Sequence, residues 1–192
     1  MGYYIGKLIF FLLGWKLAQE PPKGLRRSVM IASPHTSNWD MIIARAAFAI
    51  MRLPVKFTIK KEWFKFPFNL IMGPLGGIPI DRSPKKEGDA RISMVDAMAE
   101  LFNKYEDIIV LVTPEGTRKL QTEWKTGFYY VAKQANVPIL CGWLDYAKKH
   151  AGVGLVLNPS DDMKSDLKQI MNFYKDITPK FPENFSVDHR YV

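Results

Sequence analysis

The pattern of hydrophobic and polar positions predicts short strands and longer helices that alternate along most of the chain. Short apolar runs between turn-forming residues indicate buried strands, and longer segments with apolar residues at helical spacing indicate helices. The predicted strands cover residues 28–32, 55–59, 78–80, 108–113, 137–142 (with 143–146 as a candidate continuation) and 153–157, and the predicted helices cover residues 39–51, 87–104, 127–135 and 163–177. This alternation predicts an α/β domain whose mixed, largely parallel central sheet is flanked by helices.

The N-terminal segment is the most continuously hydrophobic part of the chain. Residues 3–18 read YYIGKLIFFLLGWKLA, which is shorter than the ~20 residues of a membrane-spanning helix and contains Lys7. No charge precedes Lys7, and no small-residue cleavage site follows, so the segment does not fit a secretory signal peptide. We predict a helix that lies in one leaflet, with Trp15 and the lysines at headgroup level. A terminal helix packed on the protein's own core is the alternative. We therefore assign residues 1–20 to a membrane-associating helix and 21–192 to a single domain.

The net charge and the cysteine content indicate the classes of partner and the compartment that suit the chain. The net charge is +8, from 27 Lys+Arg against 19 Asp+Glu, which suits nucleic acid, an anionic membrane surface or a phosphorylated substrate. The basic residues are spread along the chain and form no nucleic-acid motif, so we expect no nucleic-acid partner. The single cysteine, Cys141, cannot form an internal disulfide, which favours a reducing compartment. No cluster of metal ligands is evident, and we expect no metal.

Polar clusters follow three of the predicted strands, where ligands bind in sheets of this class. In the first cluster, four residues separate His35 from Asp40, which begins the next helix. A carboxylate that reaches the imidazole fixes its tautomer and raises its basicity, as a general base requires. No serine or cysteine nucleophile is paired with it, so the base would activate a substrate hydroxyl. Taken alone, the spacing is also that of an ordinary loop histidine followed by an aspartate that favours the helix dipole.

The other two clusters carry arginines. Residues 76–82 lead into a short strand that presents Arg82, whose planar fork suits a phosphate, although a surface pair with Asp81 is the alternative. After the strand at 108–113 come Glu115, Gly116 and Arg118. Gly116 lets the backbone approach a ligand, Arg118 can hold a phosphate, and Glu115 can orient an arginine or a ligand hydroxyl.

Together these blocks resemble the glycerolipid acyltransferase family that makes phosphatidic acid, the 1-acylglycerol-3-phosphate acyltransferases and their relatives. The matching segments, in the family's order, are Pro34–Asp40 (H-x4-D), the lysine-rich Ile59–Phe64, Gly77–Arg82, Pro114–Arg118 (PEGTR) and Val137–Ile139. The resemblance runs from about Ser28 to Leu140. The chain departs from the family's pattern at Thr113 and at residues 140–145, and its N-terminal hydrophobic section is short.

The resemblance implies a reaction and roles for these residues. His35, oriented by Asp40, would deprotonate the hydroxyl of lysophosphatidic acid for attack on an acyl thioester, giving phosphatidic acid and a free thiol. The resemblance also implies that five residues bind substrate: Arg82, Glu115, Gly116 and Arg118 at the phosphate and glycerol, and Lys60 at the phosphate or the developing oxyanion. No cofactor is expected beyond the co-substrate, which is acyl-CoA or the thioester of acyl carrier protein.

The expected partners are a lysophospholipid, the acyl thioester or acyl carrier protein, and an anionic membrane surface. The expected location is the cytoplasmic face of a membrane, with peripheral or monotopic attachment. Two alternatives stay open. One is the same chemistry on another lysolipid acceptor, because residues 140–145 depart from the family. The other is a non-catalytic protein that binds anionic lipid.

Overall fold

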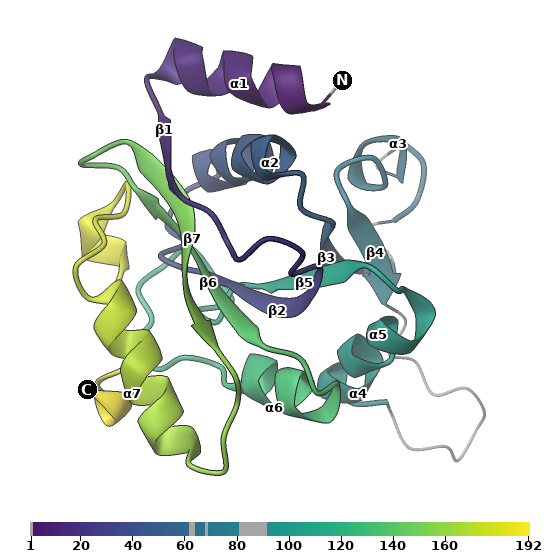
Figure 1. Cartoon of the computed structure of the whole chain (residues 1–192), viewed down its shortest axis with the longest axis vertical. Helices are drawn as coiled ribbons and strands as arrows, with labels where there is room; N and C mark the ends of the chain where they lie inside the picture. The colour runs from purple at the N-terminus through teal and green to yellow at the C-terminus, as the bar shows by residue number, and fades with distance from the viewer. Residues whose placement is uncertain (1, 62–63, 68, 81–91) are drawn as a thin grey trace.

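The computed structural model describes residues 2–61, 64–67, 69–80 and 92–192, without the side chains of Lys60 and Ile71. Its centre is a seven-stranded sheet in the order β1-β7-β6-β2-β5-β3-β4 (Figure 1). The strands are β1 Lys16–Gln19, β2 Arg27–Ala32, β3 Val55–Lys60, β4 Gly77–Ile80, β5 Ile108–Val112, β6 Ile139–Asp145 and β7 His150–Leu157. Only β6 and β7 pair in antiparallel orientation among these strands; the other five pairs are parallel. The predicted mixed, largely parallel sheet is confirmed.

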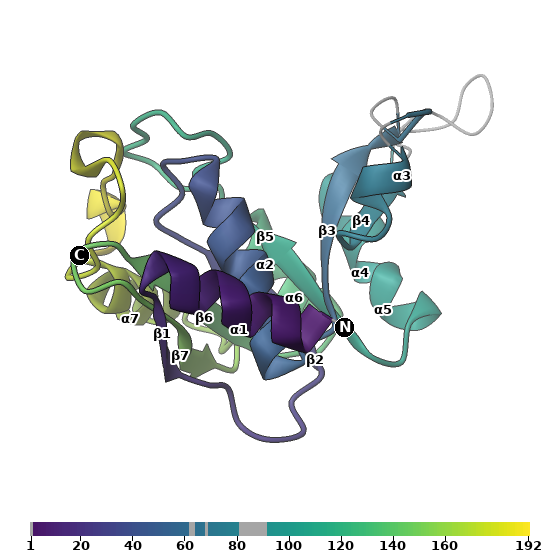
Figure 2. The same ribbon diagram turned by 90° about the horizontal axis from the view of Figure 1, so that it is seen from above.

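Helices cover both faces of the sheet (Figures 1 and 2). On one face lie α1 Gly2–Leu13 and α2 Trp39–Met51. On the other lie α4 Met94–Ala99, α5 Leu101–Lys104, α6 Gly127–Gln134 and α7 Met163–Tyr174. Helix α3 Asn69–Met72 precedes β4, and two 3-10 turns, η2 Pro182–Asn184 and η3 His189–Tyr191, end the chain. The central strand β2 shows why both faces need cover. Val29 and Ile31 join the core on the α6–α7 side, and Met30 joins the core under α2. All three are fully buried, as the continuous apolar run predicts.

The N-terminal helix ends earlier than its hydrophobic pattern predicts. Gly14 adopts a φ of +70°, the Gly14 N–H donates to the Phe11 carbonyl, and the Trp15 N–H donates to the Phe10 carbonyl. This is the Schellman arrangement, in which a left-handed glycine closes the last turn of a helix. The contact between the Phe10 and Trp15 rings completes it. The predicted helix is therefore wrong over residues 14–18. The chain leaves the helical conformation at Gly14, and the residues that follow form β1, which pairs with β7.

Helix α1 packs on α2 through one side and leaves the other side exposed. A Cβ atom at Gly6 would lie 2.7 Å from the Ala46 carbonyl oxygen, so the glycine lets the two backbones approach closely. Phe10 is buried in the same contact. The exposed side carries Tyr4, Ile5, Leu8, Phe11 and Leu12, with Phe11 82% exposed. In the part of the chain that the structure describes, no helix has the length and apolar character needed to cross a membrane.

Other helices and strands begin or end a few residues away from their predicted boundaries. The helix predicted over 87–104 is two short helices in its described part, and the first begins after Ser93, whose hydroxyl accepts the Asp96 N–H. Residues 87–91 lie outside the described residues. The last helix ends at Tyr174, before the predicted residue 177. Strand β6 continues to Asp145, close to the end of the candidate continuation over residues 143–146, and β7 begins at His150, before the predicted residue 153.

Candidate active site

The loop between β2 and α2 holds the predicted histidine and aspartate side by side. The Nδ1 atom of His35 lies 3.2 Å from the Oδ2 atom of Asp40. Asp40 occupies the first turn of α2, and its side chain is 8% exposed, while that of His35 is 22% exposed. A buried carboxylate therefore faces one nitrogen of a partly accessible imidazole ring.

The environment of Asp40 fixes the state of that ring. The backbone N–H groups of Thr36 and Ser37 donate to Oδ2 at 3.0 and 2.9 Å. The Tyr146 hydroxyl donates to Oδ1 at 2.6 Å. An ionised carboxylate only accepts hydrogen bonds, so Nδ1 of His35 is the donor and Nε2 keeps its lone pair in the neutral ring. This is the tautomer that can remove a proton from a substrate.

Tyr146 itself stays neutral. Burial, followed by the hydrogen bond to Asp40 and the charge of that carboxylate, raises the pKa of Tyr146 well above its ordinary value. The phenol therefore keeps its proton and donates a hydrogen bond to Asp40.

Glu115 binds the loop that carries His35. It is 4% exposed, and its Oε1 atom accepts hydrogen bonds from the Ser33 hydroxyl at 2.7 Å and from the His35 N–H at 3.2 Å. Burial raises the pKa of Glu115 above its ordinary value, against the opposing effect of the hydrogen bond from Ser33. Among the described residues, its Oε2 atom has no hydrogen-bond partner. The structure thus brings Glu115 to His35, while its predicted contact with substrate stays a prediction.

Cationic side chains lie at the same end of the sheet. Gly116 is exposed at a φ of +68°, and a Cβ atom there would lie 2.7 Å from the Lys125 ammonium nitrogen. Arg118 is exposed and forms no ion pair with any described residue. Arg82 lies outside the described residues, as does the side chain of Lys60, so their predicted roles stay predictions. Residues 2–61, 64–67, 69–80 and 92–192 contain no group of three or more His, Cys, Asp or Glu placed to hold a metal.

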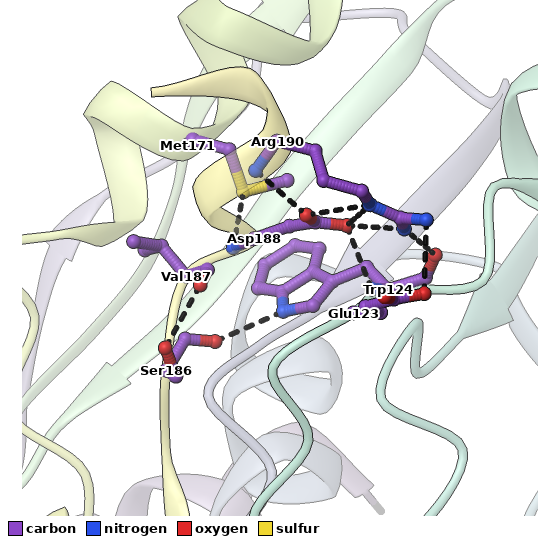
Figure 3. A network of polar contacts seen from close by, with 7 residues as sticks. All are labelled: Glu123, Trp124, Met171, Ser186, Val187, Asp188 and Arg190. Atoms are coloured by element: carbon purple, nitrogen blue, oxygen red, sulfur yellow. Dashed lines mark hydrogen bonds and ion pairs between the residues drawn. The ribbon is translucent and has the colours of Figure 1, made fainter.

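An ion pair with a buried carboxylate joins the loop after Arg118 to the C-terminus (Figure 3). Asp188 is fully buried and accepts hydrogen bonds from the Trp124 N–H at 2.9 Å and from the Arg190 guanidinium at 2.7 Å. The Trp124 indole N–H donates to the Ser186 carbonyl. Although burial acts to raise the pKa of Asp188, the hydrogen bonds from Arg190 and Trp124 bring it below its ordinary value. This network, including the pair between Arg190 and Glu123, fixes the segment that leads into α6.

Three of the residues around the site are absent from the sequence-based candidates. Tyr146 lies 106 residues beyond Asp40, and Ser33 lies 82 residues before Glu115. No spacing rule connects partners that far apart. Lys125 is one exposed lysine among many, and only the turn at Gly116 identifies its position.

Comparison with known proteins identifies the family and a similar fold. A family model described as acyltransferase matches residues 18–144, which include both loops of the site. The fold is similar to that of the 1-acyl-sn-glycerophosphate (LPA) acyltransferase PlsC from Thermotoga maritima. The TM-score is 0.57 at 16% identity, over 91% of this chain and 75% of that one. A search of curated proteins finds no match.

Proposed function

We propose that this chain, which belongs to the acyltransferase family, moves a fatty acyl group from an acyl thioester to the free hydroxyl of lysophosphatidic acid. The observation that carries the proposal is the pair formed by His35 and Asp40, with Nδ1 bound to a buried carboxylate and Nε2 left as the basic atom. The match of the family model to residues 18–144 supports the reaction class.

The chemistry follows from the pair. Nε2 of His35 takes the proton of the acceptor hydroxyl while the hydroxyl oxygen attacks the carbonyl carbon of the thioester. Asp40 stabilises the imidazolium that forms. The tetrahedral intermediate then collapses, the carbon–sulfur bond breaks, and the imidazolium returns its proton to the departing thiolate. The products are an ester and a free thiol. The cycle uses no metal and no cofactor beyond the thioester of coenzyme A or acyl carrier protein.

The acceptor is proposed from the cations on the loop between β5 and α6, which also carries Glu115. Exposed Arg118, together with Lys125 beside Gly116, offers positive charge that described carboxylates do not neutralise. A phosphate monoester, with up to two negative charges, gains more from such a site than a zwitterionic headgroup does. Arg82 and Lys60 are proposed to add to this phosphate site, and the Gly116 backbone and Glu115 to border the glycerol.

The proposed location is the cytoplasmic face of a membrane, with peripheral or monotopic attachment. Apolar side chains are exposed on α1, and others are exposed at the start of α2, where Trp39, Met41 and Ile42 flank Asp40 in the sequence. A lipid acceptor in a bilayer would thus meet an apolar surface next to the catalytic pair. The net charge of +8 favours an anionic bilayer.

An acceptor series tests the proposed substrate. Purified protein and palmitoyl-CoA are incubated with lysophosphatidic acid, with lysophosphatidylcholine or without acceptor, and release of free thiol is followed. We expect release with lysophosphatidic acid to exceed release with the zwitterionic acceptor by at least about tenfold, since one lost ionic contact is worth about 1.5–3 kcal/mol. The reverse preference would assign the same chemistry to another lysolipid. No thiol release with any acceptor, from either coenzyme A or acyl carrier protein donors, would overturn the proposal.

A further inference from the structure

Tyr146 lies just beyond the segment that matches the acyltransferase family, yet its side chain reaches the centre of the site. It follows the last residue of β6, and its hydroxyl donates to the Oδ1 atom of Asp40 at 2.6 Å. The two oxygens of that carboxylate have different partners. Oδ2 is held by two backbone N–H groups and by His35, whereas Tyr146 is the only partner of Oδ1 among the described residues.

Tyr146 is itself held in place by two contacts to its ring and one to its backbone. The Tyr146 and Trp15 rings form a T-shaped contact, with centroids 5.0 Å apart. The ammonium of Lys180 lies 5.6 Å from the centroid of the Tyr146 ring, in cation–π geometry. The Tyr146 N–H donates to the Thr178 carbonyl at 2.8 Å. A ring anchored to both ends of the chain has little freedom to turn its hydroxyl away from Asp40.

Removal of that hydroxyl has a defined local consequence. Oδ1 of Asp40 would become a buried acceptor without a protein partner, which is unfavourable for a charged group. The carboxylate could then regain a partner for Oδ1 by rotating about its Cβ–Cγ bond. Rotation would draw Oδ2 away from Nδ1 of His35 and would release the ring from the tautomer that leaves Nε2 basic.

We propose that Tyr146 is a positioning residue for acyl transfer, which holds the Asp40 carboxylate in the orientation that aligns His35. This inference rests on the proposed function, because the pair that Tyr146 positions is the proposed catalytic pair. Tyr146 acts through Asp40 and contacts no reacting atom, so its removal affects turnover and not substrate binding.

The test compares two tyrosine variants that differ from the wild type by one oxygen atom each. Tyr146→Phe removes the bond to Asp40. Tyr129→Phe is the matched control, because the Tyr129 hydroxyl donates to Asp166 at 2.8 Å in the same way. That second pair links α6 to α7, on the face of the sheet opposite α2. We expect Tyr146→Phe to lower kcat about tenfold and to leave KM for both substrates within twofold. Tyr129→Phe should keep the wild-type kcat while lowering the midpoint of unfolding.

A second readout does not depend on turnover. In protein labelled with nitrogen-15 at histidine, the His35 Nδ1 proton bound to Asp40 should give a downfield NMR signal, assigned by its loss in His35→Ala. We expect this signal to shift or to broaden in Tyr146→Phe and to persist in Tyr129→Phe. An unchanged signal with unchanged kcat would overturn the inference, as would a raised KM at wild-type kcat, which would make Tyr146 a binding residue. An inactive wild type whose signal responds as expected would overturn the proposed function, while still showing that Tyr146 holds Asp40 against His35.

Discussion

Asp40 accepts hydrogen bonds from two backbone N–H groups, one imidazole and one phenol. A carboxylate with this many donors is costly to move, because each lost donor leaves a buried charge less well solvated. The partner histidine is held from the other side, where its backbone N–H donates to Glu115. The geometry of the pair is therefore set before any substrate binds, which is what general base catalysis requires.

Glu115 gives a prediction about pH at the scale of one residue. Burial raises its pKa in the folded protein above the unfolded value of about 4.3, so its ionised form is disfavoured in the fold. The stability it contributes is highest below about pH 4.3 and falls as pH rises through the folded pKa. Glu115→Gln keeps an acceptor for Ser33 and His35 but cannot ionise. We expect the stability of this variant relative to the wild type to increase as pH rises above 4.

Urea unfolding at a series of pH values measures this difference. Glu20→Gln, at an exposed acid, is the control and should follow the wild-type curve at every pH. Wild-type and Glu115→Gln curves that run parallel from pH 4 upward would show that burial does not raise the pKa of Glu115 in the folded protein.

Sequence and structure agree at this scale only where partners are close in the chain. His35 and Asp40 are five positions apart, so their contact was predictable from the helix that begins between them. Glu115 was predicted at the site, but its bond to the His35 backbone depends on the packing of two loops 80 residues apart. Tyr146 had no local signal, because an aromatic residue after an apolar strand is equally typical of a core position.

The elements differ in how far local sequence determines them. Helix α2 begins and ends where its pattern predicts, at Trp39 and Met51. Helix α1 does not, since a single glycine within an apolar run ends it and β7 provides an edge for the residues that follow. Strand pairing of this kind depends on tertiary contacts that override helical propensity.

The exposed side of α1 gives a prediction at the scale of the element. If this side enters a bilayer, then Phe11→Glu should weaken binding to anionic liposomes at least tenfold, because burial of a Phe side chain is worth about 1.5–3 kcal/mol. The fold should be unaffected, since Phe11 is 82% exposed. Tyr130→Glu is the matched control, as Tyr130 is exposed on α6, on the opposite face of the sheet. Flotation with liposomes measures both, and equal binding by the two variants would contradict the docking of α1.

At the scale of the whole molecule, the strand order explains how the site assembles. The adjacent strands β5, β2 and β6 are parallel, so their carboxyl ends lie at one edge of the sheet (Figure 1). Glu115 follows the first of these strands, His35 follows the second and Tyr146 follows the third. Sites at this edge are the rule in open parallel sheets. The sequence predicts the strands and the polar residues after them, but it does not predict their order, which depends on long-range pairing.

The most direct test of the account is the effect of His35→Ala on thiol release from palmitoyl-CoA with lysophosphatidic acid as acceptor. The chain has three histidines, so His150→Ala and His189→Ala are matched controls. General base catalysis contributes about 10²–10⁴-fold, and we predict that His35→Ala loses at least a hundredfold in kcat while both controls keep wild-type rates. Release by His35→Ala at the rate of the wild type would contradict the assignment of His35 as the base.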